Sequence, residues 1–305
     1  MYDLKRIVVS VDFSDLDEEV IRYASIVSQI MGADTIYFVH VAETLDLPDH
    51  LEESYRTVLA PVDETFEHEV QILVEKYFPD QDGTQAKVDI LEGKPTEELI
   101  KYGRQKDADL IILGKPEEPN KYVQLSKIAE LSTCSTLFVP HDADIKIEKI
   151  AVALDFSEYS KMALEQALKF REEGENVTIY GHHVYQIPKG YSKTGKSYAE
   201  FSQIMEENAQ KDAQKFFNKH SLDEDICEMR YQLSEDAKVD DELFDFAKKK
   251  DMDLLIIGSR GRTVAASLLL GSVAERLLRY RGNIPLYIVK EKNSNMSFLE
   301  ALFNL

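Results

Sequence analysis

The feature that most constrains the fold of this 305-residue chain is an internal duplication. The segment IVVSVDFSD at 7–15 is matched by IAVALDFSE at 150–158, and DADLIILG at 107–114 is matched by DMDLLIIG at 251–258. The two offsets, 143 and 144 residues, agree within one residue. Such agreement between separate places predicts two copies of one domain, and copies of this length form a tandem pair rather than a solenoid.

Each copy alternates short apolar runs with amphipathic segments of helical length. The first copy contains the strand-like runs RIVVSV, DTIYFVHV, AKVDIL, DLIILG and STLFVP, and the second contains KIAVAL, NVTIYGHHV, ICEMRYQL, DLLIIG and PLYIVK. Helical patterns occupy 15–31, 62–78, 95–106, 158–172, 197–219, 239–250 and 272–281. Apolar strands separated by amphipathic helices are typical of a parallel sheet covered on both faces. We therefore predict an α/β fold of two tandem open-sheet domains, each a five-stranded parallel sheet with helices on both faces.

A polar stretch that opens with a proline, PHDADIKIEK at 140–149, separates the two copies. We place the first domain at 1–143, the second domain at 144–292 and a C-terminal amphipathic tail at 293–305. The tail carries apolar residues at near-helical spacing, namely Phe298, Leu299, Leu302, Phe303 and Leu305. An apolar stripe of this kind must be covered, and the sequence leaves open whether the chain's own body or a second copy covers it.

The composition excludes several classes of partner. The chain has 56 acidic and 36 basic residues and a formal net charge of -20, which repels nucleic acids and anionic membrane surfaces. Its two cysteines, Cys134 and Cys227, form no CxxC pattern, so we expect neither a disulfide framework nor a zinc site. The N-terminus meets an aspartate after a few apolar residues, and no apolar run has the length of a membrane span. We expect a cytoplasmic protein without membrane insertion.

The junction GSRGRTVAASLLLGSVAERLL at 258–278 gathers glycines and arginines between an apolar strand and a helical pattern. Glycines permit a positive φ and the close approach of a ligand to the backbone. Ser272 and Glu275 have the S-x-x-E spacing of a capping box, which predicts that a helix begins there. Free N–H groups at a helix start favour a phosphate, and Arg260 and Arg262 add charge-assisted hydrogen bonds. The spacing alone leaves open whether this is a phosphate loop or an ordinary turn, and it matches neither a Walker A loop nor G-x-G-x-x-G.

The sequence offers little other candidate chemistry. His182 and His183 are adjacent, but neighbours on a strand point to opposite faces, so we expect a structural role for them and for the equivalent His40. No nucleophile elbow and no EF-hand spacing occurs, and we predict neither catalytic residues nor a metal site. The basic segment 185–201 fits either a flap over a ligand or, as we favour, an ordinary loop.

The pattern G-x2-G-x9-G-S after an apolar strand, together with a V-D-x-S-like motif that closes the first strand of each copy, resembles the ATP-binding members of the universal stress protein family. The resemblance covers nearly the whole chain as two tandem family domains. It implies the adenine nucleotide alpha hydrolase-like version of the α/β fold. It also implies an intramolecular pseudo-dimer through the last strands, and it leaves a homodimer open.

By this resemblance the second domain holds ATP, with or without Mg²⁺. The implied site residues are Gly258, Arg260, Gly261, Gly271, Ser272 and Val273 in the loop, Ala153, Leu154 and Asp155 after the first strand, and Val184 at the adenine end. A carboxylate is a natural acceptor for ribose hydroxyls, although the alternative for Asp155 is a helix cap or turn residue.

The first copy departs from this pattern. After Gly114 it has KPEEPNKYVQL, in which two glutamates stand in place of arginines and no later glycine follows. We therefore predict one adenine nucleotide per chain. The resemblance implies an ATP-binding stress-response regulator that acts by conformational signalling or through a regulatory protein partner. The alternatives are a weak ATPase or autophosphorylating enzyme and a scaffold that binds no nucleotide.

Overall fold

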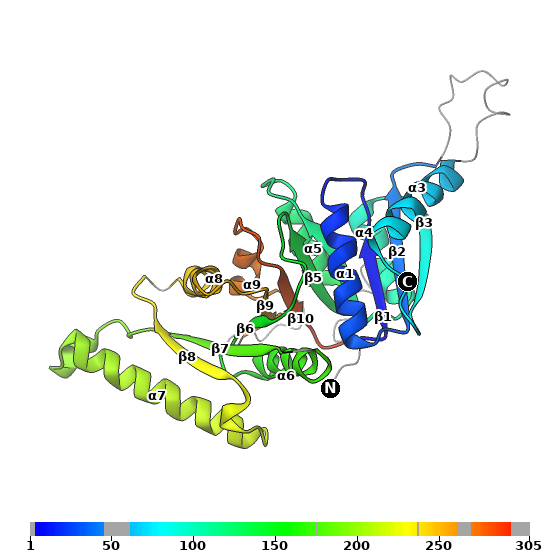
Figure 1. The fold of residues 1–305 in the computed structure, drawn as a ribbon. Helices are drawn as coiled ribbons and strands as arrows, with labels where there is room; N and C mark the ends of the chain where they lie inside the picture. The colour runs from blue at the N-terminus through cyan, green and yellow to red at the C-terminus, as the bar shows by residue number, and fades with distance from the viewer. Residues whose placement is uncertain (1–3, 46–61, 175, 237, 262–269, 294–305) are drawn as a thin grey trace, which may run out of the picture. The chain divides into compact units, whose positions relative to one another are not determined.

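The computed structural model describes residues 4–45, 62–174, 176–236, 238–261 and 270–293 of the chain (Figure 1). The chain divides into two compact units, one formed by residues 147–291 and the other by residues 2–146 with the residues from 292 onward. The apolar residues of the predicted tail, from Phe298 on, lie outside the described residues. The pairing of the two domains through their last strands stays a prediction.

The first domain is a parallel sheet with its helices in the connections. Its elements are β1 (Arg6–Ser10), α1 (Asp17–Met31), β2 (Thr35–Ala42), α3 (Val62–Tyr77), β3 (Gln85–Glu92), α4 (Pro95–Gln105), β4 (Leu110–Lys115), α5 (Tyr122–Leu131) and β5 (Ser135–Pro140). The strand order is β3-β2-β1-β4-β5, and every neighbouring pair is parallel. The central strands have buried apolar runs, at residues 7–9 of β1 and 110–113 of β4, as a sheet covered on both faces requires.

The second domain repeats this topology. Its elements are β6 (Lys149–Ala153), α6 (Glu158–Glu173), β7 (Thr178–Tyr185), the 3-10 turn η1 (Tyr191–Thr194), α7 (Tyr198–Lys219), the turn η2 (Glu224–Ile226), β8 (Glu228–Leu233), α8 (Val239–Lys249), β9 (Leu254–Gly258), α9 (Ser272–Leu277) and β10 (Leu286–Val289). The parallel order is β8-β7-β6-β9-β10, equivalent to that of the first domain. The predicted fold class and all ten predicted strands are confirmed.

This topology creates a crevice at one place in each sheet. In the second domain the chain leaves β6 toward β7 on one side, whereas β9 lies on the other side of β6 with Ile150 opposite Leu254. Connections that depart in opposite directions from adjacent strands leave room at their carboxyl ends, where open α/β sheets bind ligands. We therefore expect a ligand site at the carboxyl ends of β6 and β9.

The helices differ from the sequence predictions at two points. Helix α5 was not among the predicted helices, although it is a regular element with five buried residues. Helix α9 ends at Leu277, four residues before the predicted end, because the next residues form tight turns instead: Arg279 N–H donates to the carbonyl of Arg276, and Tyr280 N–H to that of Leu277.

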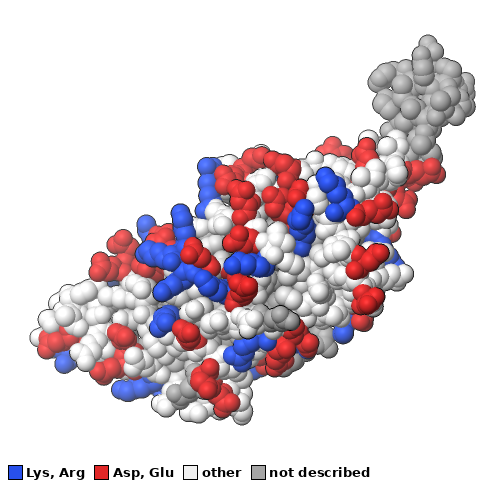
Figure 2. Space-filling view, in the orientation of Figure 1, with Lys and Arg blue, Asp and Glu red and all other residues white. Residues whose placement is uncertain are grey.

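None of the helices in the described ranges combines the length and the apolar composition that a membrane-spanning helix requires. On the face drawn in Figure 2, acidic and basic side chains are interspersed. This face therefore shows no broad basic surface of the kind that binds nucleic acid.

A carboxylate joins the two central strands in each domain, buried in the second domain and half-buried in the first. Asp253 is 3% exposed, and its Oδ2 accepts hydrogen bonds from the backbone N–H groups of Glu148 and Lys149 at 2.9 and 2.8 Å. In the first domain Asp109 Oδ2 accepts the equivalent bonds from Lys5 and Arg6 at 2.9 and 2.8 Å. The aspartate that precedes the fourth strand thus fixes the start of the first strand.

We expect Asp253→Ala to lower the free energy of unfolding of the second domain by about 2–4 kcal/mol, because two backbone N–H groups at the start of β6 lose their charged acceptor. Urea unfolding, followed by circular dichroism, measures this change. Asp245→Ala, on the exposed side of α8, is the control and should change stability by less than about 0.5 kcal/mol. Equal effects of the two substitutions would contradict this explanation.

Candidate functional site

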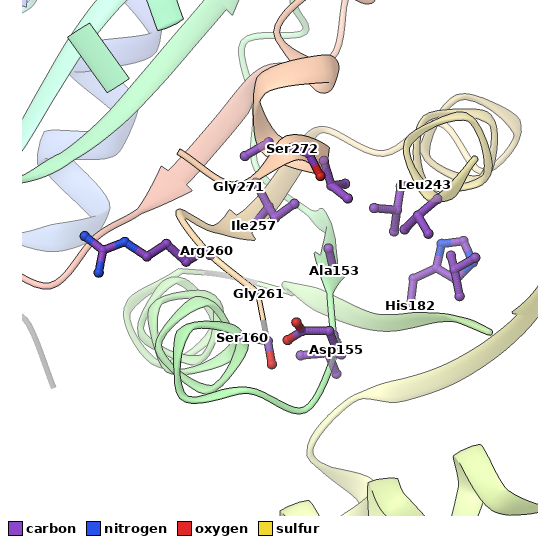
Figure 3. Close-up of a pocket in the computed structure, with 16 residues that line it drawn as sticks. Ala153, Asp155, Ser160, His182, Leu243, Ile257, Arg260, Gly261, Gly271 and Ser272 are labelled. Carbon is purple, nitrogen blue, oxygen red and sulfur yellow. The ribbon is translucent and has the colours of Figure 1, made fainter. Parts of the chain in front are cut away.

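The second domain contains a cavity of about 240 Å³ at the carboxyl ends of β6 and β9 (Figure 3). All ten residues that the sequence singled out line it: Ala153, Leu154, Asp155, Val184, Gly258, Arg260, Gly261, Gly271, Ser272 and Val273. Six further residues complete its wall, namely Ser160, His182, Val239, Leu243, Ile257 and Ala274. Four segments far apart in the sequence therefore meet at one cavity, although its ligand stays a prediction.

Asp155 forms the turn that the sequence offered as one alternative, and its side chain also lines the cavity. Its Oδ1 accepts a hydrogen bond from Ser157 N–H at 3.0 Å, which closes a tight turn in which Phe156 has a φ of 63°. Ser157 in turn caps α6, because its side chain accepts a bond from Ser160 N–H at 3.2 Å. Asp155 also lines the cavity. The turn holds this carboxylate at the strand end while its second oxygen, Oδ2, faces the glycine loop.

The glycines of the loop are required by close packing rather than by a positive φ. A Cβ at Gly258 would lie 2.7 Å from the backbone carbonyl of Tyr159, and a Cβ at Gly261 would lie 2.8 Å from Asp155 Oδ2. A Cβ at Gly271 would lie 3.3 Å from the carbonyl oxygen of Ser259. None of the three has the left-handed φ that we also considered. They allow the loop backbone to approach α6 and the Asp155 turn.

The start of α9 corrects one prediction. The helix begins at Ser272 as expected, but the N-cap residue is Gly271, so the predicted capping box of Ser272 and Glu275 is wrong. Gly271 N–H donates to the carbonyl of Ser259 at 2.8 Å, and its own carbonyl accepts from Glu275 N–H at 2.9 Å. The Gly271 N–H group is thus already hydrogen-bonded within the loop. Ser272 instead becomes the first helical residue, with its exposed side chain at the cavity.

Arg260 lines the cavity but directs its charge elsewhere. Its guanidinium carbon lies 5.2 Å from the centre of the Tyr159 ring, and its Nη1 donates to the Tyr159 hydroxyl at 2.7 Å. Figure 3 shows the side chain extending away from Asp155 and Ser272. A bond from Arg260 to a phosphate therefore requires the side chain to leave Tyr159. The second predicted arginine, Arg262, lies outside the described residues.

The two adjacent histidines have different surroundings. The strand alternation places them on opposite faces, as predicted. His183 is structural: its Nδ1 lies 2.7 Å from the carbonyl oxygen of Leu154, and its ring stacks on Phe156 at 4.4 Å. His40 has the same arrangement in the first domain, with Nδ1 2.9 Å from the carbonyl oxygen of Val11. These two histidines support the turn that follows the first strand of each domain.

His182, for which we predicted a structural role, lines the cavity instead. The residue is 2% exposed, and its Nδ1 has no hydrogen-bond partner within the described part of the chain. An unpaired buried polar atom costs about 1–3 kcal/mol. Burial, with a smaller contribution from His183, lowers the pKa of His182 to about 4, so the imidazole is neutral near pH 7. A comparison of the two copies contains the signal that the sequence analysis missed: the residue of the first copy that is equivalent to His182 is Val39, which is apolar.

The first domain has an equivalent cavity of about 190 Å³, which is lined by Ser10, Val11, Asp12, Val41, Leu99 and Gly114 among other residues. The same turn is present, because Asp12 Oδ1 accepts from Ser14 N–H at 3.2 Å and Phe13 has a φ of 58°. A second, acidic cavity of about 240 Å³ shares Asp12, Gly114 and Lys121 with the first and carries four carboxylates, from Asp12, Asp15, Glu117 and Glu118, beside Lys121 and His141. Four carboxylates repel a polyphosphate at close range.

The basic segment after β7 does not cover the cavity. It forms η1 between Gly190 and Gly195, which both have a left-handed φ, and Tyr191 packs against Tyr198 and Phe201 of α7. None of these residues lines the cavity. The placement favours the loop interpretation over the flap. Elsewhere in the described ranges, no group of three His, Cys, Asp or Glu side chains comes together to hold a metal ion.

The lowered pKa of His182 gives the second domain a specific pH dependence. The unfolded chain binds a proton near the ordinary pKa of 6.5, whereas the folded chain resists protonation until about pH 4. The part of the free energy of unfolding that depends on neutral His182 is therefore fully present above about pH 6.5, and it is lost as the pH falls toward 4. Between pH 7 and pH 4 we expect the wild type to lose up to about 3 kcal/mol more stability than His182→Leu. Urea unfolding over this range measures the difference, and parallel pH profiles for the two proteins would contradict the assignment.

Comparisons with known proteins identify the chain's relatives. A universal stress protein of Methanocaldococcus jannaschii is 25% identical over 164 residues, which cover 49% of this chain and 99% of the relative. One from Synechocystis is 30% identical over 146 residues, which cover 43% of this chain and 91% of the relative. A crystal structure of a universal stress protein from Archaeoglobus fulgidus matches 94% of this chain and 97% of its own, with a TM-score of 0.62 and 19% identity, and so shows the shared fold.

The relatives of single-domain length each match about half of the chain, as a duplicated protein requires. The model of the universal stress protein family matches twice, at residues 3–140 and at residues 146–290. The chain therefore belongs to the universal stress protein family and contains two tandem copies of its domain.

Proposed function

We propose that the second domain binds one ATP molecule per chain and that the protein is an ATP-responsive regulator of the stress response. The observation that carries this proposal is the cavity at the ends of β6 and β9, at which all ten residues implied by the family resemblance meet. A crevice at this place of an open α/β sheet is the usual ligand site of the fold class. Membership of the universal stress protein family supports the same role.

The cavity has two ends of different chemistry, which suit the two ends of a nucleotide. Val184, Val239, Leu243 and Ile257 contribute apolar wall that suits a flat base. The carboxylate of Asp155 suits the hydroxyls of a ribose, because an ionised carboxylate only accepts hydrogen bonds. We place the phosphates between the glycine loop and the Ser272 hydroxyl, and Mg²⁺, where it accompanies ATP, among the phosphate oxygens.

The first domain is unsuited to the same ligand. Its equivalent cavity lacks the arginine and the second and third glycines of the loop, and the acidic cavity beside it carries Asp15, Glu117 and Glu118. A triphosphate that extends from the equivalent cavity toward these carboxylates is repelled by them. We infer that the duplication has kept one ATP site and that the other copy serves a different purpose, such as contact with a regulatory protein or a second chain.

The cavity favours holding ATP over rapid turnover. Asp155 is the one carboxylate among the described residues that line the cavity, and Oδ1 of that side chain is engaged with Ser157. A general base for water is therefore not evident in this wall. Autophosphorylation is a second candidate, because the Ser272 hydroxyl is exposed at the cavity and caps no helix. Transfer would join Ser272 Oγ to the γ-phosphorus of ATP, with ADP as the leaving group and the hydroxyl proton released to solvent.

The two copies provide a matched test of ATP binding. We expect isothermal titration to give one site per chain and Asp155→Asn to weaken ATP binding about 10-fold or more, because a charge-assisted bond to the ribose is lost. The amide oxygen of asparagine still accepts the bond from Ser157, so the turn persists. Asp12→Asn, the same change in the first domain, should leave the affinity unchanged.

Two equivalent sites, or equal weakening by the two substitutions, would overturn the assignment to the second domain. No heat of binding and no thermal shift with ATP in the wild type would overturn the proposed function itself. Radiolabelled γ-phosphate separates the second candidate: label that is retained on the wild type and absent from Ser272→Ala favours autophosphorylation, and an unlabelled wild type excludes it.

A further inference from the structure

His182 is an uncompensated polar group in the second domain. The residue is 2% exposed, its Nδ1 is buried, and no partner for that atom exists among the described residues. The ring packs at 4.3 Å from the ring of Phe246, a contact that an apolar side chain would make as well. The imidazole nitrogen therefore lowers the stability of the ligand-free domain, and it makes no hydrogen bond within the described residues that would offset this cost.

The first domain shows that the fold does not need a polar residue here. The strand pairs β1–β2 and β6–β7 have the same register, in which Val9 lies opposite Phe38 and Val152 lies opposite Gly181. The next residue along each second strand is Val39 in the first domain and His182 in the second. Val39 is fully buried at 0% exposure. The histidine thus occurs in the copy that has the intact glycine loop, whereas the copy with the acidic cavity has valine.

The position of His182 indicates what the imidazole recognises. It lines the same cavity as Leu243 and Ile257, and Figure 3 shows its ring next to Leu243, across the cavity from Arg260. The end of the cavity that is apolar thus contains one uncharged hydrogen-bonding ring. This combination fits a planar heteroaromatic base, which presents polar edge atoms within an otherwise apolar outline.

We propose that His182 is a specificity-determining residue that hydrogen-bonds the edge of the nucleotide base, an inference that rests on the proposed function. A neutral imidazole has one donor and one acceptor nitrogen. Adenine presents an exocyclic amine donor beside ring-nitrogen acceptors, so either tautomer of His182 finds a partner there. Because Nδ1 is buried in the ligand-free domain, the imidazole has to rotate toward the cavity, and the bound base then supplies the hydrogen bond that this atom lacks.

The test uses two measurements whose signs differ between a binding role and a structural role. We expect His182→Leu to raise the melting temperature of the ligand-free protein by about 2–4 °C, because an unpaired buried nitrogen is removed. The same variant should bind ATP about 5–10-fold more weakly, because the bond to the base is lost. A structural histidine predicts a lower melting temperature instead.

Three controls sharpen this test. His182→Asn places an amide near the position of Nδ1 and should recover part of the ATP affinity. Val39→Leu, at the equivalent place of the first domain, should leave ATP binding unchanged. Inorganic tripolyphosphate, which has no base, should bind His182→Leu and the wild type equally, so that the loss is assigned to the base and not to the phosphates.

A spectroscopic measurement reports on His182 directly. In protein labelled with ¹⁵N at histidine, the His182 ring signals, assigned by their absence from His182→Leu, should shift when ATP is added and should stay unchanged with tripolyphosphate. ATP binding that is the same in the wild type and in folded His182→Leu would overturn this inference alone. A wild type that binds no ATP would overturn the proposed function and this inference with it.

Discussion

The site depends on the close packing of the end of β9 against the start of α6. A Cβ at Gly258 would meet the Tyr159 backbone at 2.7 Å, so the strand end and the first turn of the helix have no room for a side chain between them. The same first turn is held by Ser157, whose N–H is bonded to Asp155. The strand end, the turn and the helix start therefore form one rigid unit. Because Asp155 and Gly258 both line the cavity, this unit fixes the distance between the expected ribose and phosphate positions.

The comparison of the two domains separates what the fold requires from what a ligand requires. Both keep the strand order, the aspartate that joins the central strands, the aspartate turn with its left-handed phenylalanine and the histidine behind it. These shared features build the crevice. They do not determine its ligand, because the loop after the fourth strand differs: one copy has Arg260 at the cavity, whereas the other has Glu117 and Glu118 in the acidic cavity beside the equivalent one. The chemistry of the site thus lies in the loops on a common scaffold.

The fold and most of the residues that line the cavity could be predicted from the sequence. The predictions failed where one local sequence pattern is compatible with more than one structure. Apolar periodicity and the duplication predicted the strands because parallel strands have few alternatives. The S-x-x-E pattern at Ser272 predicted a cap, but the Gly271 backbone bonds to Ser259 and shifts the cap by one residue. The direction of Arg260 was unpredictable, since it depends on the Tyr159 ring, which only the folded chain brings near. The sequence did not predict that His182 lines the cavity, because a strand pattern does not show which buried face borders a cavity.

The polar groups of the cavity connect its occupancy to the helix beside it. A ligand changes a conformation only through contacts that differ between the two states. Arg260 is bonded to Tyr159 in the first turn of α6, so a phosphate that attracts the guanidinium removes a contact from that turn. His182 Nδ1 has no partner among the described residues, and on our inference it gains one from a bound base, which favours occupancy at the opposite end. If ATP binds as we propose, filling the cavity exchanges a protein contact at α6 for ligand contacts at the loop and at β7.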